Sequence, residues 1–294
     1  LAVGPDGLAA AQVDGEGKLV YCQFIDSVGD SAERLAQLVE AQGWEGVPCS
    51  VVLHPVYYQL LLADSPQVES AEVAAALRWK IKDLLDFPIE DAAIAHFLLP
   101  EDAYRGRQKK LYVAALRKAS LQSLVEPIES SGLLVDCIEV SELALHNIIS
   151  RFPQAGGGIA MVQLHEGEGF INLVEDGAVY LTRRLDIGLE KYNANTDNTV
   201  FFESLFLEIQ RSLDFYESQL GKGIITRLFY SPGLEQTAPI GEFLSRQLGI
   251  NVSPLDLTPL GIASEEGGPD QARCSSAIGA ALGPSQREAM RAAS

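Results

Sequence analysis

Few residues of this chain have the types and spacing that catalysis or metal binding requires. The histidines are His54, His96, His146 and His165. They share no metal-ligand spacing with one another or with the cysteines. His165, Glu166 and Glu168 could form an acid–base or metal group, although a polar hairpin loop explains the same three residues. No Gly-x-Ser-x-Gly elbow, Walker A loop or dinucleotide fingerprint is present, so we expect no catalytic residues and no metal site.

The composition describes a folded and acidic protein. Of 294 residues, 47% are hydrophobic, and 40 acidic against 22 basic side chains give a net charge of -18. Such a charge repels phosphate backbones and anionic lipid, so we expect neither nucleic acid nor direct membrane binding. The cysteines, Cys22, Cys49, Cys137 and Cys274, are scattered as in a cytosolic protein with reduced thiols. No apolar run reaches the ~20 residues that a membrane-spanning helix needs.

The chain contains a weak internal duplication. Strands are predicted at residues 1–3, 8–13 and 19–25 in the first half, and at 159–164, 170–174 and 178–185 in the second. The dipeptides Asp14-Gly15 and Asp176-Gly177 supply the positive φ angles of tight hairpin turns. Each set therefore reads as a meander of three antiparallel strands.

Helices and further strands follow each meander. The helices are predicted at 31–42, 121–130, 200–220 and 240–248, and the strands at 50–53, 133–138, 224–230 and 250–252. The helix at 200–220 has one apolar stripe, made of Phe202, Phe206, Ile209, Leu213, Tyr216 and Leu220. Two βββαβαβ units in tandem predict two α/β domains with a cleft between them. The glycine-rich residues 153–158 are the expected hinge.

Residues 56–117 are not explained by the duplication. They contain predicted strands at 56–62, 92–99 and 111–116 and a helix at 71–86. The helix would bury Ala74, Leu77, Ile81 and Leu84 and end before Pro88. We therefore expect a small α+β subdomain inserted into the first domain. The predicted boundaries are 1–55 with 118–153, then 56–117 for the insert, and 158–294 for the second domain.

The only basic cluster runs from Arg105 through Arg107, Lys109 and Lys110 at the tip of the hairpin inside the insert. A solvated turn that discourages edge-to-edge pairing of strands explains it. The alternative is an electrostatic contact with the inner membrane or with an acidic partner.

Motifs spread over nearly the whole chain resemble the PilM family of type IV pilus proteins and its MSHA-pilus relative MshI. Residues 74–79 read Ala-Ala-Ala-Leu-Arg-Trp, and residues 86–90 read Asp-Phe-Pro-Ile-Glu, like the family's inserted helix and the turn after it. Residues 208–216 are close to the family's E-I-x-R-S-L-x-[FY]-[FY] helix, and residues 241–252 and 277–282 match its C-terminal pattern. The resemblance implies an actin-like (ribonuclease H-like) α/β fold with an SHS2-type insert.

The phosphate motifs of this superfamily are altered here. Members that bind ATP carry an Asp-x-Gly on the first hairpin of each domain, where the carboxylate organises Mg²⁺. In this chain those hairpins contain Gly4-Pro5-Asp6-Gly7 and residues 165–169, with Gly167, while a single glycine, Gly233, replaces the family's Gly-Gly run. We therefore expect a degenerate nucleotide cleft near Gly4, Gly167 and Gly233, and a pseudo-ATPase without a bound cofactor. ATP with Mg²⁺ is the alternative if that cleft is still competent.

Asp186-Ile187-Gly188 does spell Asp-x-Gly, but it lies after the third strand of the second meander rather than on its first turn. The resemblance aligns it with a structural exit turn of the family. We therefore interpret it as structural and not as a phosphate loop.

The resemblance also implies a function. PilM proteins bind the cytoplasmic N-terminal tail of PilN, a single-span inner-membrane protein, between the insert and the first domain. We place Tyr57, Tyr58, Arg78 and Trp79 near such a groove, where a peptide would gain aromatic anchors. The expected protein is a scaffold at the cytoplasmic face of the inner membrane that couples the pilus platform to its motor. The alternatives are an ATP-binding switch, the cytoplasmic part of a type II secretion platform protein, and a small-molecule kinase.

Overall fold

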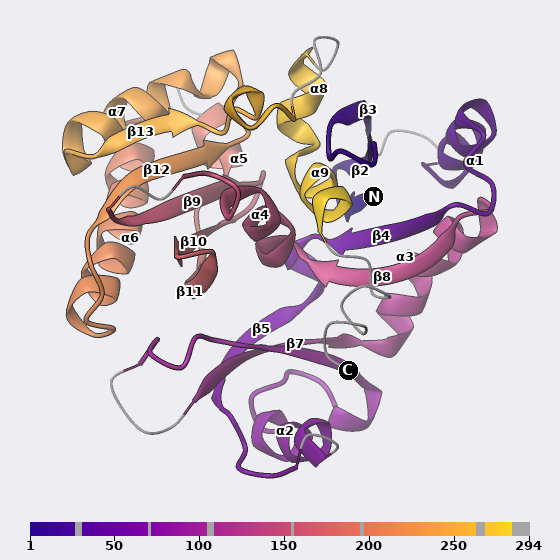
Figure 1. The fold of residues 1–294 in the computed structure, drawn as a ribbon, viewed down its shortest axis with the longest axis horizontal. Coiled ribbons are helices and arrows are strands. Elements are labelled where there is room, and N and C mark those ends of the chain that lie inside the picture. The colour runs from indigo at the N-terminus through magenta and orange to yellow at the C-terminus, as the bar shows by residue number, and fades with distance from the viewer. Residues whose placement is uncertain are drawn as a thin grey trace.

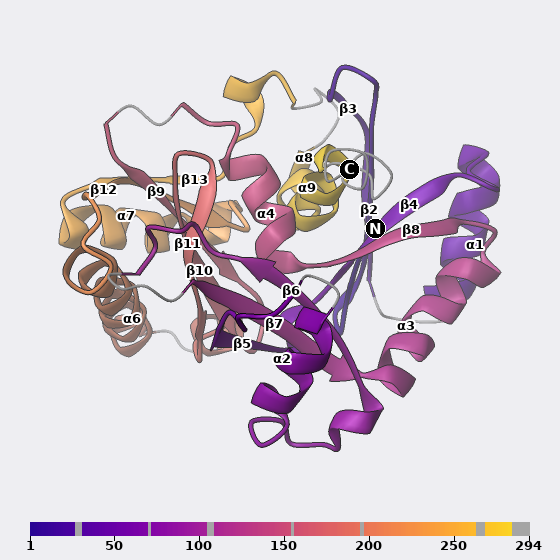
Figure 2. The ribbon, with the colours of Figure 1, turned by 60° about the horizontal axis from the view of Figure 1, so that its bottom comes forward.

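The computed structural model describes residues 1–26, 31–69, 72–104, 109–153, 156–194, 197–262 and 268–283 (Figure 1). These residues form two five-stranded sheets and one three-stranded sheet, with helices packed on their faces. The two larger sheets lie on opposite sides of a pair of helices, and the small sheet lies against both (Figures 1 and 2). Within these ranges no helix is both long enough and apolar enough to cross a membrane.

The first sheet has the strand order β3-β2-β1-β4-β8. Its strands are β1 (Ala2–Gly4), β2 (Gly7–Val13), β3 (Leu19–Asp26), β4 (Pro48–Leu53) and β8 (Leu134–Val140). The first three strands pair antiparallel, whereas β4 pairs parallel with β1 and β8 with β4, as strands that follow a helix do. The helices α1 (Ser31–Gln42) and α3 (Lys118–Ser130) cover one face of this sheet, where Leu35 and Ile128 join an apolar core with Leu8.

The second sheet repeats this order as β11-β10-β9-β12-β13. Its strands are β9 (Gly158–Leu164), β10 (Gly169–Glu175), β11 (Ala178–Leu185), β12 (Ile225–Ser231) and β13 (Asn251–Pro254). The helices α6 (Thr199–Ser218) and α7 (Ala238–Leu248) cover its outer face, where Leu205 and Leu244 are buried in one core with Val162. The repeated order confirms the predicted duplication and the α/β class of the fold.

Two helices fill the space between the larger sheets. They are α4 (Ser141–Ile149) and α9 (Ser275–Leu282), at the centre of Figure 1. Leu145 and Ile148 of α4 and Ile278 of α9 share a core with Ala9 of the first sheet and Met161 of the second. Because this core takes residues from both sheets, the two halves of the chain are held together by apolar packing.

The insert is a three-stranded antiparallel sheet with one helix. Its elements are β5 (Gln59–Asp64), β6 (Ala92–Leu98), β7 (Lys110–Arg117) and α2 (Val73–Ile81), with the strand order β5-β7-β6. Alternate residues of the central strand point to opposite faces. Val113 packs under α2, whereas Tyr112 and Ala114 face the rest of the molecule. The helix α2 therefore lies on the outer side of the insert (Figure 2).

Two predicted elements of the insert are shorter in the structure. Residues 56–58 do not begin a strand, because a 3₁₀ turn at Pro55–Tyr57 delays β5 until Gln59. The helix α2 ends at Ile81 instead of reaching residue 86, and the chain turns there with Leu84 N–H donating to the Ile81 carbonyl. Leu84 is consequently 58% exposed. Ala74, also predicted to be buried, is exposed, so the buried face is reduced to Leu77 and Ile81.

Near the N-terminus of the long helix α6, the buried positions are shifted by one residue from the predicted apolar stripe. Phe201 and Leu205 are buried, whereas Phe202 and Phe206 lie at the border of the core. From Ile209 onward the predicted positions are buried. Ser212, which is not part of the predicted stripe, is buried with them. Its hydroxyl donates to the Glu208 carbonyl at 2.9 Å, which is how a helical serine enters a core without an unpaired donor.

The predicted basic cluster lies only partly in the described chain, since residues 105–108 fall outside it. Lys109 forms an ion pair with Glu101, and Lys110 forms one with Asp64, each at 2.5 Å. Both described lysines of the cluster are thus neutralised by carboxylates of the insert itself.

Candidate functional site

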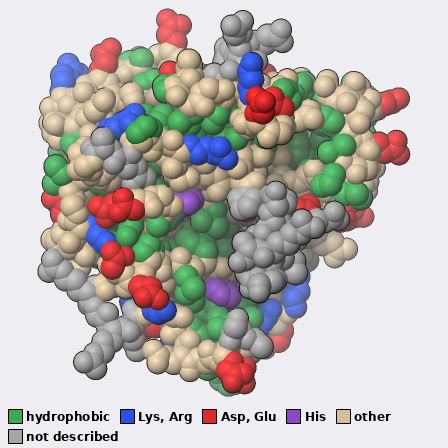
Figure 3. Space-filling model, in the orientation of Figure 1, with side chains coloured by type: hydrophobic (Ala, Val, Ile, Leu, Met, Phe, Trp, Pro, Cys, Tyr) green, Lys and Arg blue, Asp and Glu red, His purple; other side chains and the backbone are tan. Residues whose placement is uncertain are grey.

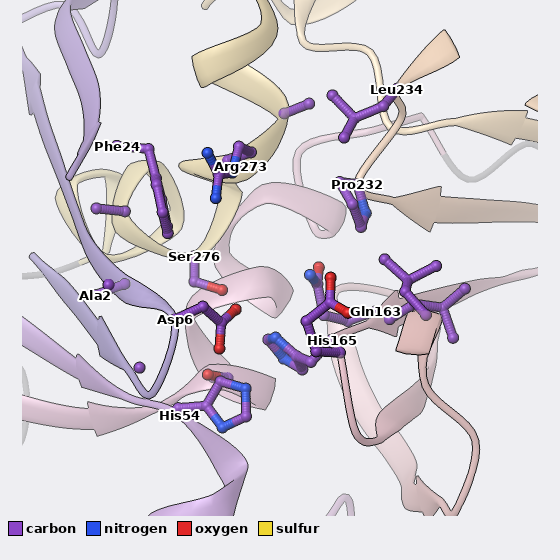
Figure 4. A pocket seen from close by; sticks show the side chains of 18 of the residues that line it. Ala2, Asp6, Phe24, His54, Gln163, His165, Pro232, Leu234, Arg273 and Ser276 are labelled. Atoms are coloured by element: carbon purple, nitrogen blue, oxygen red, sulfur yellow. The ribbon is translucent and has the colours of Figure 1, made fainter. Parts of the chain in front are cut away.

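A cavity of about 400 Å³, called the cleft below, lies between the two larger sheets at the turns of their first hairpins (Figure 4). The first sheet contributes Gly4 and Asp6 from its β1–β2 turn, and the second contributes Gln163 and Glu166 around its β9–β10 turn. The segment 232–237 and two short helices, α5 (Leu189–Asn193) and α8 (Gly268–Arg273), also border the cleft.

The three predicted glycines are grouped around this cleft. Gly4 lines it, and a Cβ atom there would stand 3.4 Å from Cδ2 of His54. Gly167 directly follows Glu166, which lines the cleft, and a Cβ there would meet nothing within 4 Å. Gly233 stands between lining residues, and its Cβ would come within 2.6 Å of Pro254. Gly167 and Gly233 therefore differ in their steric surroundings. Neighbouring atoms leave no room for a side chain at Gly233, whereas a side chain would fit at Gly167.

Two histidines from different sheets meet at the floor of the cleft. The rings of His54, which follows β4, and His165, which follows β9, have centroids 4.0 Å apart. His54 Nδ1 accepts a hydrogen bond from the Val56 N–H at 3.1 Å, so the neutral ring carries its proton on Nε2. Burial lowers the pKa of His54 to about 4, and burial followed by the neighbouring His54 holds the pKa of His165 well below its ordinary value. Both imidazoles are therefore neutral at pH 7 and add no positive charge.

A buried carboxylate lies beside the histidine pair. Glu168 lies in the β9–β10 turn, directly before β10. It is 5% exposed and forms an ion pair with Arg184 of β11. Its Oε1 is 4.0 Å from Nδ1 of His54, a nitrogen already occupied by the Val56 N–H. Burial raises the pKa of Glu168, and the charge of Arg184 opposes that rise. The guanidinium of Arg184 is thus used to neutralise Glu168.

A second buried carboxyl group connects three elements below the cleft. The Tyr58 hydroxyl donates to Glu142 Oε2 at 2.5 Å and accepts from the Ser141 N–H at 3.1 Å. The side-chain amide of Asn172 on β10 donates to the Glu142 carbonyl at 2.8 Å. Burial raises the pKa of Glu142 to about 7, against the stabilising hydrogen bond from Tyr58. This network ties the start of the insert to α4 and to the second sheet.

The lining of the cleft is more acidic than basic. Besides the two histidines, its charged side chains are Asp6, Glu166, Asp270 and Arg273. Arg273 forms an ion pair with Asp26 at 3.1 Å, and its guanidinium lies 3.6 Å from the ring centroid of Phe24, as Figure 4 shows at one end of the cleft. In the described ranges no lysine lines the cleft, and no group of three His, Cys, Asp or Glu side chains could hold a metal ion.

The four residues predicted to bind a partner do not form one surface. Tyr58 is 6% exposed and bonded to Glu142, whereas Tyr57 lies beside the cleft with its ring 6.4 Å from that of His54. Arg78 donates to the carbonyl of Ile89, before β6, and to that of Ala92, the first residue of β6. Trp79, the next residue of α2, is 73% exposed on the outer side of the insert. Only Tyr57 and Trp79 present ring surface to solvent, and they do so at different places.

The sequence analysis missed Ser141 and Glu142, because the helix α4 that carries them was not predicted. A signal was present. Ser141 and Glu142 precede apolar side chains at Ala144, Leu145 and Ile148, which is a helix start followed by helical periodicity. The contact of Glu142 with Tyr58 had no such signal, since the two residues are 84 positions apart.

Similarity to solved structures defines the class of this chain. It matches a structure described as the PilM-PilN type IV pilus biogenesis complex with a TM-score of 0.73 and 18% identity, over 96% of each chain. It also matches a protein of unknown function with an actin-like ATPase fold from Bacteroides thetaiotaomicron, with a TM-score of 0.53 and 9% identity, over 88% of this chain and 92% of that one. The chain therefore has the actin-like ATPase fold.

The sequence alone gives no such match. No family model matches the chain. No curated protein matches it either. The likeness to the PilM-PilN structure, at 18% identity, is thus a likeness of fold.

Proposed function

We propose that this protein is a non-enzymatic scaffold of a type IV pilus assembly platform, of the PilM or MshI kind, at the cytoplasmic face of the inner membrane. It would bind the N-terminal cytoplasmic tail of a PilN-like protein and help to link the platform with its motor. The observation that carries the proposal is the agreement in fold with PilM over 96% of both chains, insert included. The motifs at residues 74–79 and 208–216 support the same assignment.

The cleft supports the absence of ATPase activity. A nucleoside triphosphate with Mg²⁺ needs cations and a carboxylate that organises the metal. Here Asp6, Glu166 and Asp270 face the space, the imidazoles are neutral, and Arg273 is already paired with Asp26. Phosphate oxygens placed against these carboxylates would be repelled. The described lining residues thus offer carboxylates but no unpaired cation for the phosphates, so we expect them not to hold the Mg-ATP that the fold's ATP-binding members hold.

The test is a pair of calorimetric titrations of the intact protein. One titrant is Mg-ATP, and the other is a synthetic peptide with the N-terminal cytoplasmic tail sequence of a PilN-like protein. We expect heat with the tail peptide and none with millimolar Mg-ATP. A tail peptide that releases no heat at any concentration would remove the proposed partner, whatever the nucleotide result.

The second candidate is an ATP-binding switch of the same platform. The cleft between the two larger sheets favours it, because a cavity of about 400 Å³ can enclose a small molecule. Micromolar binding of Mg-ATP in the titration above would select this candidate. It would also show that the altered hairpin turns still contact phosphate.

A further inference from the structure

The outer side of the insert carries an exposed tryptophan with cationic neighbours. Trp79 is 73% exposed, whereas the other tryptophan, Trp44, is 8% exposed and donates its indole N–H to Gln12 at 3.1 Å. Leu84, in the turns that follow α2, is also largely exposed. Large apolar side chains that stay in water on one small subdomain are typical of a contact surface.

Trp79 forms one wall of a groove, called the α2 groove below. Its lining residues are Arg78, Trp79, Lys82, Ile89 and Glu90, and its volume is about 440 Å³. The sheet of the insert lies between α2 and the two larger sheets (Figures 1 and 2). The α2 groove is therefore separate from the cleft and from Tyr57. Arg78 and Trp79, which were predicted to contact the partner tail together with Tyr57, line the α2 groove.

The walls of the α2 groove are held in place by hydrogen bonds. The guanidinium of Arg78 donates to the Ile89 carbonyl at 3.0 Å and to the Ala92 carbonyl at 3.1 Å. The ammonium of Lys118 donates to the Glu90 carbonyl at 2.8 Å from the start of α3. These bonds fix the segment after Pro88 against the helix, so a ligand would meet a groove that is already formed.

The charge of the α2 groove is opposite to that of the molecule. The Lys82 ammonium stands 4.5 Å from the ring centroid of Trp79. Within the described residues, neither Lys82 nor Arg78 forms an ion pair with a carboxylate, and the lining contains Glu90 as its one acid. Two cations against one carboxylate stand out in a chain whose net charge is -18. The net charge of the chain would on average repel an acidic ligand. Figure 3 shows acidic and basic side chains interspersed on the face it presents.

We infer that the α2 groove binds an acidic, apolar segment of a second partner protein. An aromatic or aliphatic side chain of that segment packs on the exposed face of Trp79 and on Ile89. A neighbouring carboxylate pairs with Lys82 and with the N–H groups of Arg78 that the two carbonyls leave free. Complementary charge selects this ligand over a basic one, and the formed groove lowers the cost of binding.

The test uses the full chain and two synthetic peptides as probes. The first peptide alternates Glu with Leu and Phe, and the second has the same order with Lys in place of every Glu. Binding to the unaltered protein is followed by tryptophan fluorescence, since Trp79 is exposed and Trp44 is buried. The affinities of all the variants are measured by fluorescence polarisation of a dye attached to the peptide, because Trp79→Ala removes the reporting tryptophan. The variants are Trp79→Ala and Lys82→Glu. The matched control is Val200→Ala on α6, because Val200 is 75% exposed and lies on the second half of the chain. None of these exposed positions should alter the melting temperature noticeably.

We expect the acidic peptide to shift the fluorescence of the protein and the basic peptide to leave it unchanged. Trp79→Ala should weaken binding of the acidic peptide by at least about tenfold, and Lys82→Glu should reverse the preference between the peptides. Val200→Ala should bind as the unaltered protein does. The tail peptide of the proposed function should not displace the acidic peptide, and its own binding should survive Trp79→Ala.

Several results would overturn this inference. They are equal binding of both peptides, unchanged affinity in Trp79→Ala, and displacement of the acidic peptide by the tail peptide. Light scattering adds a further one, because a concentration-dependent dimer that Trp79→Ala abolishes would make a second copy of the chain the occupant. Failure of the tail peptide alone, with the acidic peptide still selective for Trp79, would end the proposed function and leave this inference standing.

Discussion

Glu142 is a carboxyl group placed where ionisation is costly. Its side chain is buried where α4 begins, and its hydrogen bond from Tyr58 compensates only part of the lost hydration. Burial therefore raises the pKa of Glu142 from 4.5 to about 7. The folded protein keeps this proton over a range of pH in which the unfolded chain has already released it.

This difference predicts a contribution to stability that falls as the pH rises. It is fully present below pH 4.5 and is lost between pH 4.5 and about 7, because the folded state binds more protons there than the unfolded state. The total is at most about 3 kcal/mol, at about 1.4 kcal/mol for each pKa unit. The variant Glu142→Gln, which can still accept the Tyr58 hydrogen bond, should lack this slope. Urea unfolding of both proteins across this range measures it.

The comparison with the variant is needed because His54 contributes the opposite slope. Burial lowers the pKa of His54 from 6.5 to about 4, so its contribution is lost as the pH falls through that range. Both proteins share this term, and it cancels in their difference. Parallel pH profiles for the wild type and Glu142→Gln would contradict the prediction.

At the scale of elements, the side chains of Tyr112 and Asp102 fasten the insert to the second half of the chain at the edge of the second sheet. The Tyr112 hydroxyl of β7 donates to the Thr182 carbonyl at 2.9 Å and accepts from the Thr182 N–H at 3.2 Å. Thr182 lies on β11, an edge strand whose outward backbone groups have no further strand to pair with. A second link joins Asp102, in the turn after β6, to Lys222 and to the Tyr180 hydroxyl. The insert thus closes an edge that would otherwise be open.

Replacing Tyr112 by Phe should lower the free energy of unfolding by about 1–3 kcal/mol. The substitution leaves the buried N–H and carbonyl of Thr182 without a partner, while the ring still packs against Phe97. Hydrogen exchange of the Thr182 amide should accelerate with it.

The matched control for that variant is Tyr104→Phe. In the described part of the chain the Tyr104 hydroxyl is buried without a hydrogen-bond partner, so its removal should cost nothing or stabilise slightly. Equal losses in the two variants would mean that the ring environment, and not the bond to Thr182, determines the effect.

At the scale of the whole molecule, stability depends on how closely α4 and α9 approach each other between the two sheets. A Cβ atom on Gly279 of α9 would lie 2.0 Å from the Ala144 carbonyl oxygen of α4. The Asn147 side chain adds a hydrogen bond to the Gly279 carbonyl at 3.1 Å. The contact between the helices therefore requires a residue without a side chain at position 279.

Gly279→Ala should destabilise the protein by about 1–3 kcal/mol, because the helices must separate and loosen a core shared by both sheets. The sign is informative, since alanine favours an isolated helix over glycine. Chemical unfolding measures the loss. Gly15→Ala is the control, because a Cβ at that position meets nothing within 4 Å. A stabilised Gly279→Ala protein would show that the helices can move apart without cost.

The sequence by itself determined the elements whose signals are local. Residues 31–42 form the predicted helix because the apolar period ends at Gly43, which adopts a φ of 67°. Residues 178–185 form the predicted strand because Asp176 and Gly177, both with positive φ, make the hairpin turn before it. In the first half the prediction of positive φ at Asp14-Gly15 was wrong, because the residue with positive φ between β2 and β3 is Gly17, at 80°. The hairpin itself forms as predicted, so the duplication and the region of the cleft could also be predicted.

Only the tertiary structure decided which distant side chains meet and which remain in water. His54 and His165 come together from two sheets, and Tyr58 reaches Glu142 across 84 positions, where no local period records the contact. The helical stripe could not show that Leu84 is exposed, because the end of α2 at Ile81 turns the chain away from the core. Periodicity reports which face of an element is apolar. Burial of a particular residue depends on the neighbouring element that covers that face.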